Sequence, residues 1–201
     1  MTWTYWLGWM TFGALFRTAF SLRVEGHEHL VTDGPVLIIS NHQSFIDPPL
    51  VGSLYQTAIY YLARKSLFRG VAGWFYRQWN AIPVDQDRPD MGSLKAVIKL
   101  LKQGQRVVIF PEGSRTEDGS LGQAAPGIGL VAAKATVPIQ PVRIRGAFES
   151  LPRGAKGLRF HRLSLTIGPA IHLSPEDLRQ AAGKTGYDQL AKRLMAAVAE
   201  L

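Results

Sequence analysis

Cysteine is absent from this sequence of 201 residues. The absence excludes disulfide bonds, metal sites built from thiolates and catalysis by a cysteine nucleophile. It favours the cytoplasm as the compartment, although a periplasmic protein can also lack cysteine. With 46% hydrophobic and 19% charged residues, the chain has enough apolar side chains for one sizeable core, which excludes a disordered protein.

Acidic residues are scarce relative to basic ones. Lysine and arginine number 23 against 15 aspartates and glutamates, so the formal net charge is +8. This balance predicts anionic partners: phospholipid head groups, phosphorylated substrates or nucleic acid. Residues 143–162, which we call the basic strip, hold six basic side chains against the single acid Glu149. The strip is either a solvated surface or a face turned toward an anionic partner.

Residues 2–16 form a stretch of fifteen residues without a charged side chain. As a helix the stretch would span about 22 Å, which is short for a hydrocarbon core of roughly 30 Å. It lacks the basic start and cleavage site of a signal peptide. Trp3, Trp6 and Trp9 recur at helical spacing, and tryptophan favours the head-group level of a membrane. We expect a helix that lies in or dips into one leaflet; the alternative is an amphipathic helix packed on the protein's own core.

The rest of the chain alternates β-rich runs with helical patterns. The alternation predicts an α/β fold, a layered domain with a largely parallel mixed sheet flanked by helices. We expect strands at residues 22–25, 36–40, 59–63, 81–84, 106–110, 137–145 and 162–167. Helices are expected at 94–102, after Ser174 and around 190–198, with Ser93 as an N-cap and Gly104 just past a helix end.

The predicted strand 36–40 is followed by a polar segment, Asn-His-Gln-Ser-Phe-Ile-Asp-Pro, at residues 41–48. Ligands of such sheets bind beyond the carboxyl ends of the strands, where this segment lies. On one helix, His42 and Asp47 would point about 140° apart, so a turn must bring them together. A neutral imidazole held by a carboxylate can remove a proton from a hydroxyl. Alternatively, His42 is a core histidine and Asp47, followed by Pro48, is only a helix N-cap.

The predicted strand 106–110 leads into a second polar segment, which carries Glu112, Gly113, Ser114 and Arg115. An arginine beside free backbone N–H groups is suited to binding a phosphate. The sequence contains neither a P-loop nor a Gly-x-Ser-x-Gly nucleophile elbow, so two common catalytic signatures are excluded.

Together the two segments resemble the first and third motifs of the 1-acylglycerol-3-phosphate acyltransferase family, lysophospholipid acyltransferases with a His-x₄-Asp signature. Residues 81–85, Ala-Ile-Pro-Val-Asp, are similar to the family's second motif, and residues 137–142, Val-Pro-Ile-Gln-Pro-Val, to its fourth. The motifs occur in the family's order and spacing. The uncharged, tryptophan-rich start predicts a membrane-associating helix at residues 1–21, and the resemblance, which covers roughly residues 22–145, implies a glycerolipid acyltransferase domain at residues 22–201.

The resemblance implies transfer of a fatty acyl group from acyl-CoA or an acyl-carrier protein to the free hydroxyl of a lysophospholipid. In that interpretation His42 is the general base, Asp47 orients it, and Glu112, Gly113, Ser114 and Arg115 bind the phosphate of the acceptor. The implied partners are the thioester donor, the lysophospholipid and an anionic membrane surface. The implied location is the cytoplasmic face of the cell membrane. Neither a metal nor an organic cofactor is implied.

The sequence departs from the family pattern at several positions. Asn80 and Gln86 stand where the second motif usually has glycine and arginine, and Ala125 lies where a lysine is common. The last two changes remove cations expected near the acceptor phosphate. Arg88 is the candidate that compensates for them, or else an ordinary solvated loop residue. A different lysolipid acceptor therefore stays open.

Two other functions are compatible with part of the sequence: phospholipid binding without catalysis, and nucleic-acid binding. A non-catalytic module that binds phospholipid head groups would use the same polar segments without chemistry. Nucleic-acid binding has only the positive charge in its favour, because no recognition motif is present, so no nucleic-acid partner is expected. His27 and His29, two positions apart, are typical of an exposed turn rather than a metal site.

Overall fold

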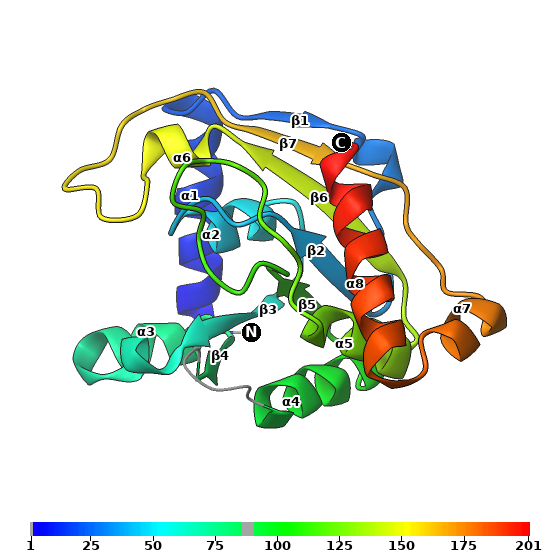
Figure 1. Cartoon of the computed structure of the whole chain (residues 1–201). Helices are drawn as coiled ribbons and strands as arrows, with labels where there is room; N and C mark the ends of the chain where they lie inside the picture. Colours follow the sequence, from blue (N-terminus) through cyan, green and yellow to red (C-terminus); the bar gives the residue numbers. More distant parts are fainter. Residues whose placement is uncertain (1, 86–90) are drawn as a thin grey trace.

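The computed structural model describes residues 2–85 and 91–201 (Figure 1). Its helices are α1 (Trp3–Thr18), α2 (Asp47–Gly52), α3 (Gly70–Gln78), α4 (Met91–Lys102), α5 (Gly127–Ala135), α6 (Ala147–Ser150), α7 (Pro175–Gln180) and α8 (Gly183–Ala199), with short 3-10 turns η1 (His27–His29) and η2 (Lys65–Phe68). Its strands are β1 (Arg23–Glu25), β2 (Val36–Ser40), β3 (Ile59–Arg64), β4 (Ala81–Val84), β5 (Arg106–Ile109), β6 (Ile139–Arg145) and β7 (Ser164–Ile167).

The strands form one seven-stranded sheet in the order β1-β7-β6-β2-β5-β3-β4. The five strands from β6 to β4 in that order run parallel to one another. β7 is antiparallel to β6, and β1 is parallel to β7, so these two strands run the other way. The predicted α/β fold with a largely parallel mixed sheet is confirmed, and each predicted strand is found with its ends shifted by at most two residues.

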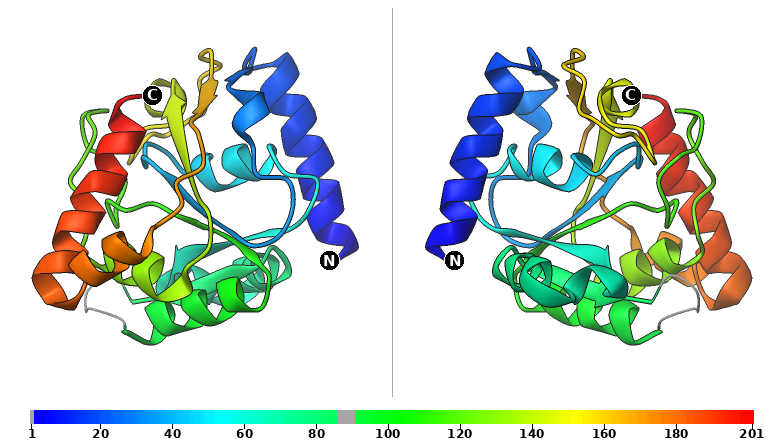
Figure 2. Two further views of the ribbon diagram at one scale, coloured as in Figure 1. Left: turned by 90° about the vertical axis from the view of Figure 1, so that its right-hand side faces the viewer. Right: turned by 90° about the vertical axis from the view of Figure 1, so that its left-hand side faces the viewer.

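Helices cover both faces of the sheet, as Figure 2 shows with α8 and α1 on opposite sides. The central strand β2 is buried along its whole length, which explains its continuous apolar sequence. Leu37 and Ile39 point into the core beneath α4, α5 and α8. Val36 and Ile38 point into the core beneath α1 and α2. The sheet therefore holds β2 rigidly from both sides.

α1 packs on the protein's own core along one side and exposes apolar residues along the other. Tyr5 and Phe16 are buried beneath it, and the Trp9 indole N–H donates to the Gly52 carbonyl at 3.2 Å. Trp9 is therefore half-buried, whereas Trp3 and Trp6 are exposed. The large apolar side chains that α1 exposes are Trp3, Trp6, Leu7 and Met10. Within the described part of the chain, no helix has the length and hydropathy needed to cross a membrane.

The predicted helix ends are partly right. Ser174 caps α7 in a reciprocal capping box with Asp177. Gly104 follows the end of α4 with φ of 84°, a left-handed conformation that glycine adopts without strain. The N-cap prediction for Ser93 is wrong, because Ser93 lies inside α4 and its hydroxyl donates to the Pro83 carbonyl at 3.1 Å.

Candidate active site

The two polar segments meet at one edge of the sheet. His42 follows β2, and residues 112–115 follow β5, which is hydrogen-bonded to β2 in parallel register. Parallel neighbours end at the same edge, so the sheet itself brings these segments together. The two segments therefore lie together beyond these two strands, and a ligand site formed by them stays a prediction.

His42 and Asp47 are in direct contact. The Nδ1 atom of His42 lies 2.7 Å from Oδ2 of Asp47, whose side chain is fully buried. The turn expected between them is present, because α2 begins at Asp47 and the preceding residues are not helical. The sequence suggested Asp47 as an N-cap, and this alternative is wrong. Asp47 is the first residue of α2, and its carboxylate turns back toward the loop before it.

The same carboxylate oxygen also fixes the loop. The backbone N–H groups of Gln43 and Ser44 both donate to Oδ2 of Asp47 at 2.6 Å. Burial raises the pKa of the Asp47 carboxyl above its ordinary value, and the hydrogen bonds from His42, Ser44 and Gln43 oppose that rise. The five-residue spacing thus lets one oxygen hold both the imidazole and the backbone that carries it.

The His42 ring is held on its face as well as at Nδ1. It stacks on Phe110, with ring centroids 4.2 Å apart and an interplanar angle of 17°. Its carbonyl accepts from the Thr116 N–H at 2.9 Å. With Nδ1 engaged by Asp47, the nitrogen left for a ligand is Nε2, and His42 lines a large cavity.

Glu112 connects the two segments through backbone hydrogen bonds. One of its oxygens accepts from the His42 N–H at 2.9 Å, and the other accepts from the Gly122 N–H at 3.1 Å. Burial raises the pKa of the Glu112 carboxyl, while these two hydrogen bonds lower it. This geometry favours a positioning role over the predicted contact with a phosphate, because both oxygens are occupied and a carboxylate repels an anion.

Two further residues hold the first segment, and neither was identified as a site residue from the sequence. The Asn41 amide donates to the Ile144 carbonyl at 2.9 Å and accepts from the Ile144 N–H at 2.7 Å. The Ser44 hydroxyl donates to the Leu151 carbonyl at 2.8 Å. Asn41 and Ser44 are buried. They tie the loop that carries His42 to β6 and to the chain after α6.

The cavity beside His42 has a volume of about 880 Å³ and two kinds of wall. A polar wall includes His42, Ser114, Arg115 and Arg153, and a second wall is apolar and aromatic. The apolar wall includes Phe12, Phe45, Leu67, Phe75 and Trp79. A cavity of this kind suits an amphiphile with an anionic head and a hydrocarbon tail.

Arg115 lies at the polar wall over an aromatic ring. Its guanidinium carbon is 4.3 Å from the centroid of Phe45, a cation–π distance that fixes the side chain beside the cavity. Partial burial and the nearby Arg153 lower the pKa of Arg115. Gly113 has φ of 72° and, like Ser114, is exposed at the cavity.

The chain is similar to known proteins. The sequence profile of the family described as Acyltransferase matches residues 21–145, a span that holds both polar segments. Over 181 residues the chain is 32% identical to the 1-acyl-sn-glycerol-3-phosphate acyltransferase of Bacillus subtilis, which covers 86% of this chain and 87% of that protein. The chain belongs to the acyltransferase family.

Other relatives of this chain are longer. A chloroplastic 1-acyl-sn-glycerol-3-phosphate acyltransferase of Arabidopsis thaliana is 32% identical over 164 residues, which are 79% of this chain but 46% of that protein. The chain therefore spans about half the length of that relative. The crystal structure of the 1-acyl-sn-glycerophosphate acyltransferase PlsC from Thermotoga maritima has the same fold, with a TM-score of 0.72 at 24% identity. It covers 96% of this chain and 80% of its own.

The structure explains one of the departures of this chain from the family pattern. Asn80 has φ of 59°, a left-handed conformation that glycine adopts freely and asparagine tolerates better than most residues. Replacing the usual glycine by asparagine therefore preserves the turn. Ala125 is exposed and is not among the residues that line the cavity. Gln86 and Arg88 lie outside the described residues.

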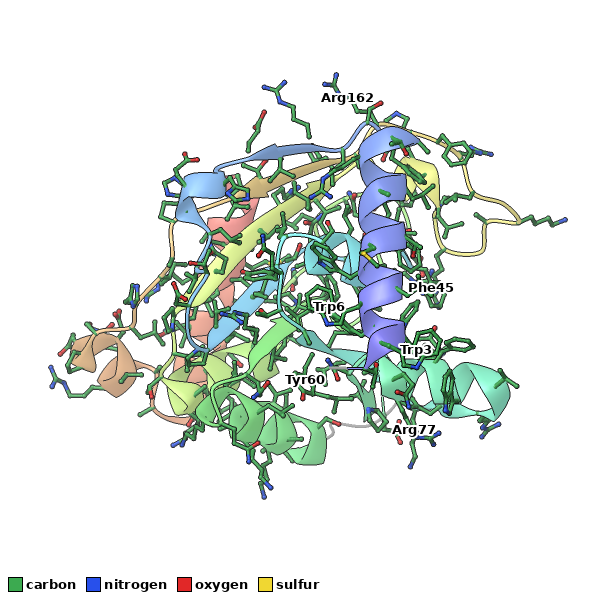
Figure 3. All side chains as sticks on the ribbon, turned by 180° about the vertical axis from the view of Figure 1, so that it is seen from behind. Trp3, Trp6, Phe45, Tyr60, Arg77 and Arg162 are labelled. Carbon is green, nitrogen blue, oxygen red and sulfur yellow. The ribbon has the colours of Figure 1, made fainter. Side chains whose placement is uncertain are left out.

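Several residues that line the cavity were not predicted as site residues. Arg64, Tyr76 and Arg153 all line the cavity. The sequence signal for Arg153 was the basic strip. Among the described cavity-lining residues, Arg153 is the only one from that strip. Arg162, at the end of the strip, lies at the opposite end of α1 from Trp3 (Figure 3). No local pattern marks Tyr76, because its position depends on how α3 packs.

Proposed function

We propose that this acyltransferase moves a fatty acyl group from a thioester donor to the free hydroxyl of 1-acylglycerol-3-phosphate, giving phosphatidic acid. The observation that carries the proposal is the contact of His42 with buried Asp47 at 2.7 Å, on the wall of a cavity that also presents Arg115 and aromatic side chains. The names of the relatives support the choice of acceptor.

The reaction needs one proton carrier and no enzyme nucleophile. Nε2 of His42 removes the proton of the acceptor hydroxyl as the hydroxyl oxygen attacks the thioester carbonyl carbon. Asp47 holds Nδ1–H and stabilises the positive charge that develops on the ring. When the tetrahedral intermediate collapses, the C–S bond breaks and the imidazolium returns its proton to the departing thiolate. The products are an ester and a free thiol.

The second segment supplies the site for the acceptor's phosphate. Arg115 provides a fixed guanidinium, and the Ser114 side chain and backbone bond to none of the described residues, so both are available to a ligand. Glu112 does not bind the phosphate in this proposal; its carboxylate holds the backbone N–H of His42. We therefore place the phosphate at Gly113, Ser114 and Arg115, and assign Glu112 the positioning role.

An exposed apolar surface adjoins the cavity and gives lipid substrates a route to it. α1 and α3 meet where the Thr2 hydroxyl donates to the Gln78 carbonyl at 3.0 Å, and Figure 3 shows Trp3 at that end of α1. We define the apolar surface as the exposed side chains of Trp3, Leu7, Met10, Val71, Trp74 and Phe75. Phe75 also lines the cavity. Exposed aromatic residues of this kind suit the head-group region of a bilayer, which supports membrane association.

The decisive experiment is the His42→Ala variant assayed with lysophosphatidic acid and either acyl-CoA or acyl-carrier protein. The released thiol can be titrated directly, because the chain has no cysteine to react with the reagent, and mass spectrometry identifies the lipid product. Loss of the base should lower kcat by about 10²–10⁴-fold. The exposed His172→Ala is the matched control. Turnover by His42→Ala at the wild-type rate would exclude His42 from the mechanism. Lysolipid binding without thiol release by the wild type would indicate a non-catalytic lipid-binding module.

A further inference from the structure

A second cavity lies beside the first, on the same face of the sheet. It has a volume of about 490 Å³ and is lined by residues of η2, α3 and β4, among them Ala81 and Pro83. In the register of β3 and β4, Ala81 is opposite Tyr61 and Pro83 is opposite Ala63. Opposite residues of paired strands point to the same face, and both Tyr61 and Ala63 line the large cavity. The two cavities are therefore neighbours on the α1 side of the sheet.

The second cavity carries positive charge without a compensating acid. Its charged lining residues are Lys65, Arg69 and Arg77, and no aspartate or glutamate is among the described lining residues. Within the described ranges, 2–85 and 91–201, none of these cations forms an ion pair. The Arg77 guanidinium carbon lies 5.9 Å from the centroid of Phe68, which also lines the cavity. A concave site with unpaired cations is suited to a ligand that carries several negative charges.

Residues of η2 lie between the two cavities. Ser66 lines both cavities, while its neighbour Leu67 lines the large one and Phe68 lines the basic one. A ligand that crosses Ser66 would thus place one end beside His42 and the other among the cations. A thioester donor has this shape, because its acyl group and its phosphates lie at opposite ends of a flexible pantetheine arm.

We propose that the basic cavity binds the phosphates of coenzyme A while the acyl end of the same molecule lies in the His42 cavity. The basic cavity has this role only if the chain transfers acyl groups as proposed above. Its size is within the range of about 300–1,000 Å³ that is usual for small-molecule sites. A carrier protein would need a broad contact of roughly 800 Å² on this chain instead of a pocket.

The test compares charge removal at the basic cavity with equal charge removal elsewhere. The test variant combines Lys65→Gln, Arg69→Gln and Arg77→Gln. The control combines Lys134→Gln, Lys184→Gln and Lys192→Gln, exposed residues of α5 and α8, which pack on the other face of the sheet. Each protein is titrated calorimetrically with free coenzyme A and with dephospho-coenzyme A. Each is also assayed with acyl-CoA and with an acyl thioester of N-acetylcysteamine, which has no phosphate.

We expect the test variant to bind coenzyme A about 10- to 100-fold more weakly and to show a matching rise in KM for acyl-CoA. Its rate with the phosphate-free thioester should stay at the wild-type value, and the control should resemble the wild type throughout. Dephospho-coenzyme A should bind the wild type more weakly than coenzyme A, and added salt should reduce this difference.

Each alternative result has a distinct meaning. Unchanged affinity of the test variant for coenzyme A overturns the proposal. A wild type that is active with acyl-carrier protein but not with acyl-CoA also overturns it. So does a test variant that keeps its affinity for coenzyme A and loses only its co-sedimentation with anionic vesicles. If the wild type binds coenzyme A through these cations but transfers no acyl group, the proposed function fails while the binding site stands.

Discussion

Replacing Glu112 by glutamine separates a positioning role from a substrate-binding role at this residue. The carboxylate accepts from two backbone N–H groups, those of His42 at 2.9 Å and Gly122 at 3.1 Å. A glutamine amide has one oxygen, so one of the two N–H groups would face an NH₂ group instead of an acceptor. The variant keeps the size of the side chain and loses at least one hydrogen bond to a charged group.

The magnitude follows from that lost bond. A hydrogen bond to a charged group contributes about 1.5–3 kcal/mol. If the loss is expressed as misplacement of His42 in the transition state, it corresponds to roughly a 10- to 150-fold decrease in kcat. The acceptor KM should change by less than about 2-fold, because a side chain that binds no substrate contributes no uniform binding energy.

Steady-state kinetics with varied lysophosphatidic acid at saturating donor measure both constants. The matched control is Glu149→Gln, the same change at an exposed acid of α6. Circular dichroism and thermal unfolding check that the fold is retained. A large rise in KM with kcat unchanged would mean that Glu112 contacts the acceptor directly. Wild-type values for both constants would refute the positioning role.

Two further predictions concern the Asn41–Ile144 hydrogen bonds and the exposed apolar surface. Asn41→Ala leaves the N–H and the carbonyl of Ile144 without their partners. Thermal unfolding should show a loss of about 2–5 kcal/mol in stability, and kcat should fall. An unchanged melting temperature would contradict this prediction. Trp3→Ser combined with Trp74→Ser should reduce co-sedimentation with anionic liposomes several-fold, whereas Leu158→Ser, at another exposed apolar residue, should not; equal losses in both proteins would contradict a specific membrane surface.

The strands and the His42–Asp47 pair could be predicted because their signals are local. β-branched runs mark the strands, and a buried strand followed by histidine and aspartate marks the place where a sheet binds its ligands. The supporting contacts could not be predicted in the same way. Asn41 reaches Ile144 across 103 positions, and Glu112 reaches the His42 backbone across 70. Hydrogen bonds of such separation depend on strand order, which composition and periodicity do not encode.

The two cavities show the same limit from another direction. Lys65, Arg69 and Arg77 line one pocket, an arrangement that the sequence alone did not show. That arrangement requires η2 and α3 to fold over the edge strand β4. Likewise, Trp9 follows the same spacing as Trp3 and Trp6, yet a hydrogen bond to Gly52 turns it inward. Periodicity indicates a helix, whereas the packing partner decides which side chains are left exposed.

If His42 and Asp47 act as proposed, the complete burial of Asp47 favours the transition state over the resting state. Desolvation disfavours the carboxylate while the imidazole is neutral, which is why burial raises the pKa of Asp47. In the proposed mechanism His42 takes a proton from the acceptor hydroxyl, the ring becomes a cation 2.7 Å from Oδ2, and the attraction then offsets the desolvation. The carboxylate is therefore better stabilised in the transition state than in the resting enzyme, the difference that accelerates a reaction. An exposed aspartate at the same distance would be solvated in the resting state and in the transition state, so its stabilisation would differ less between them.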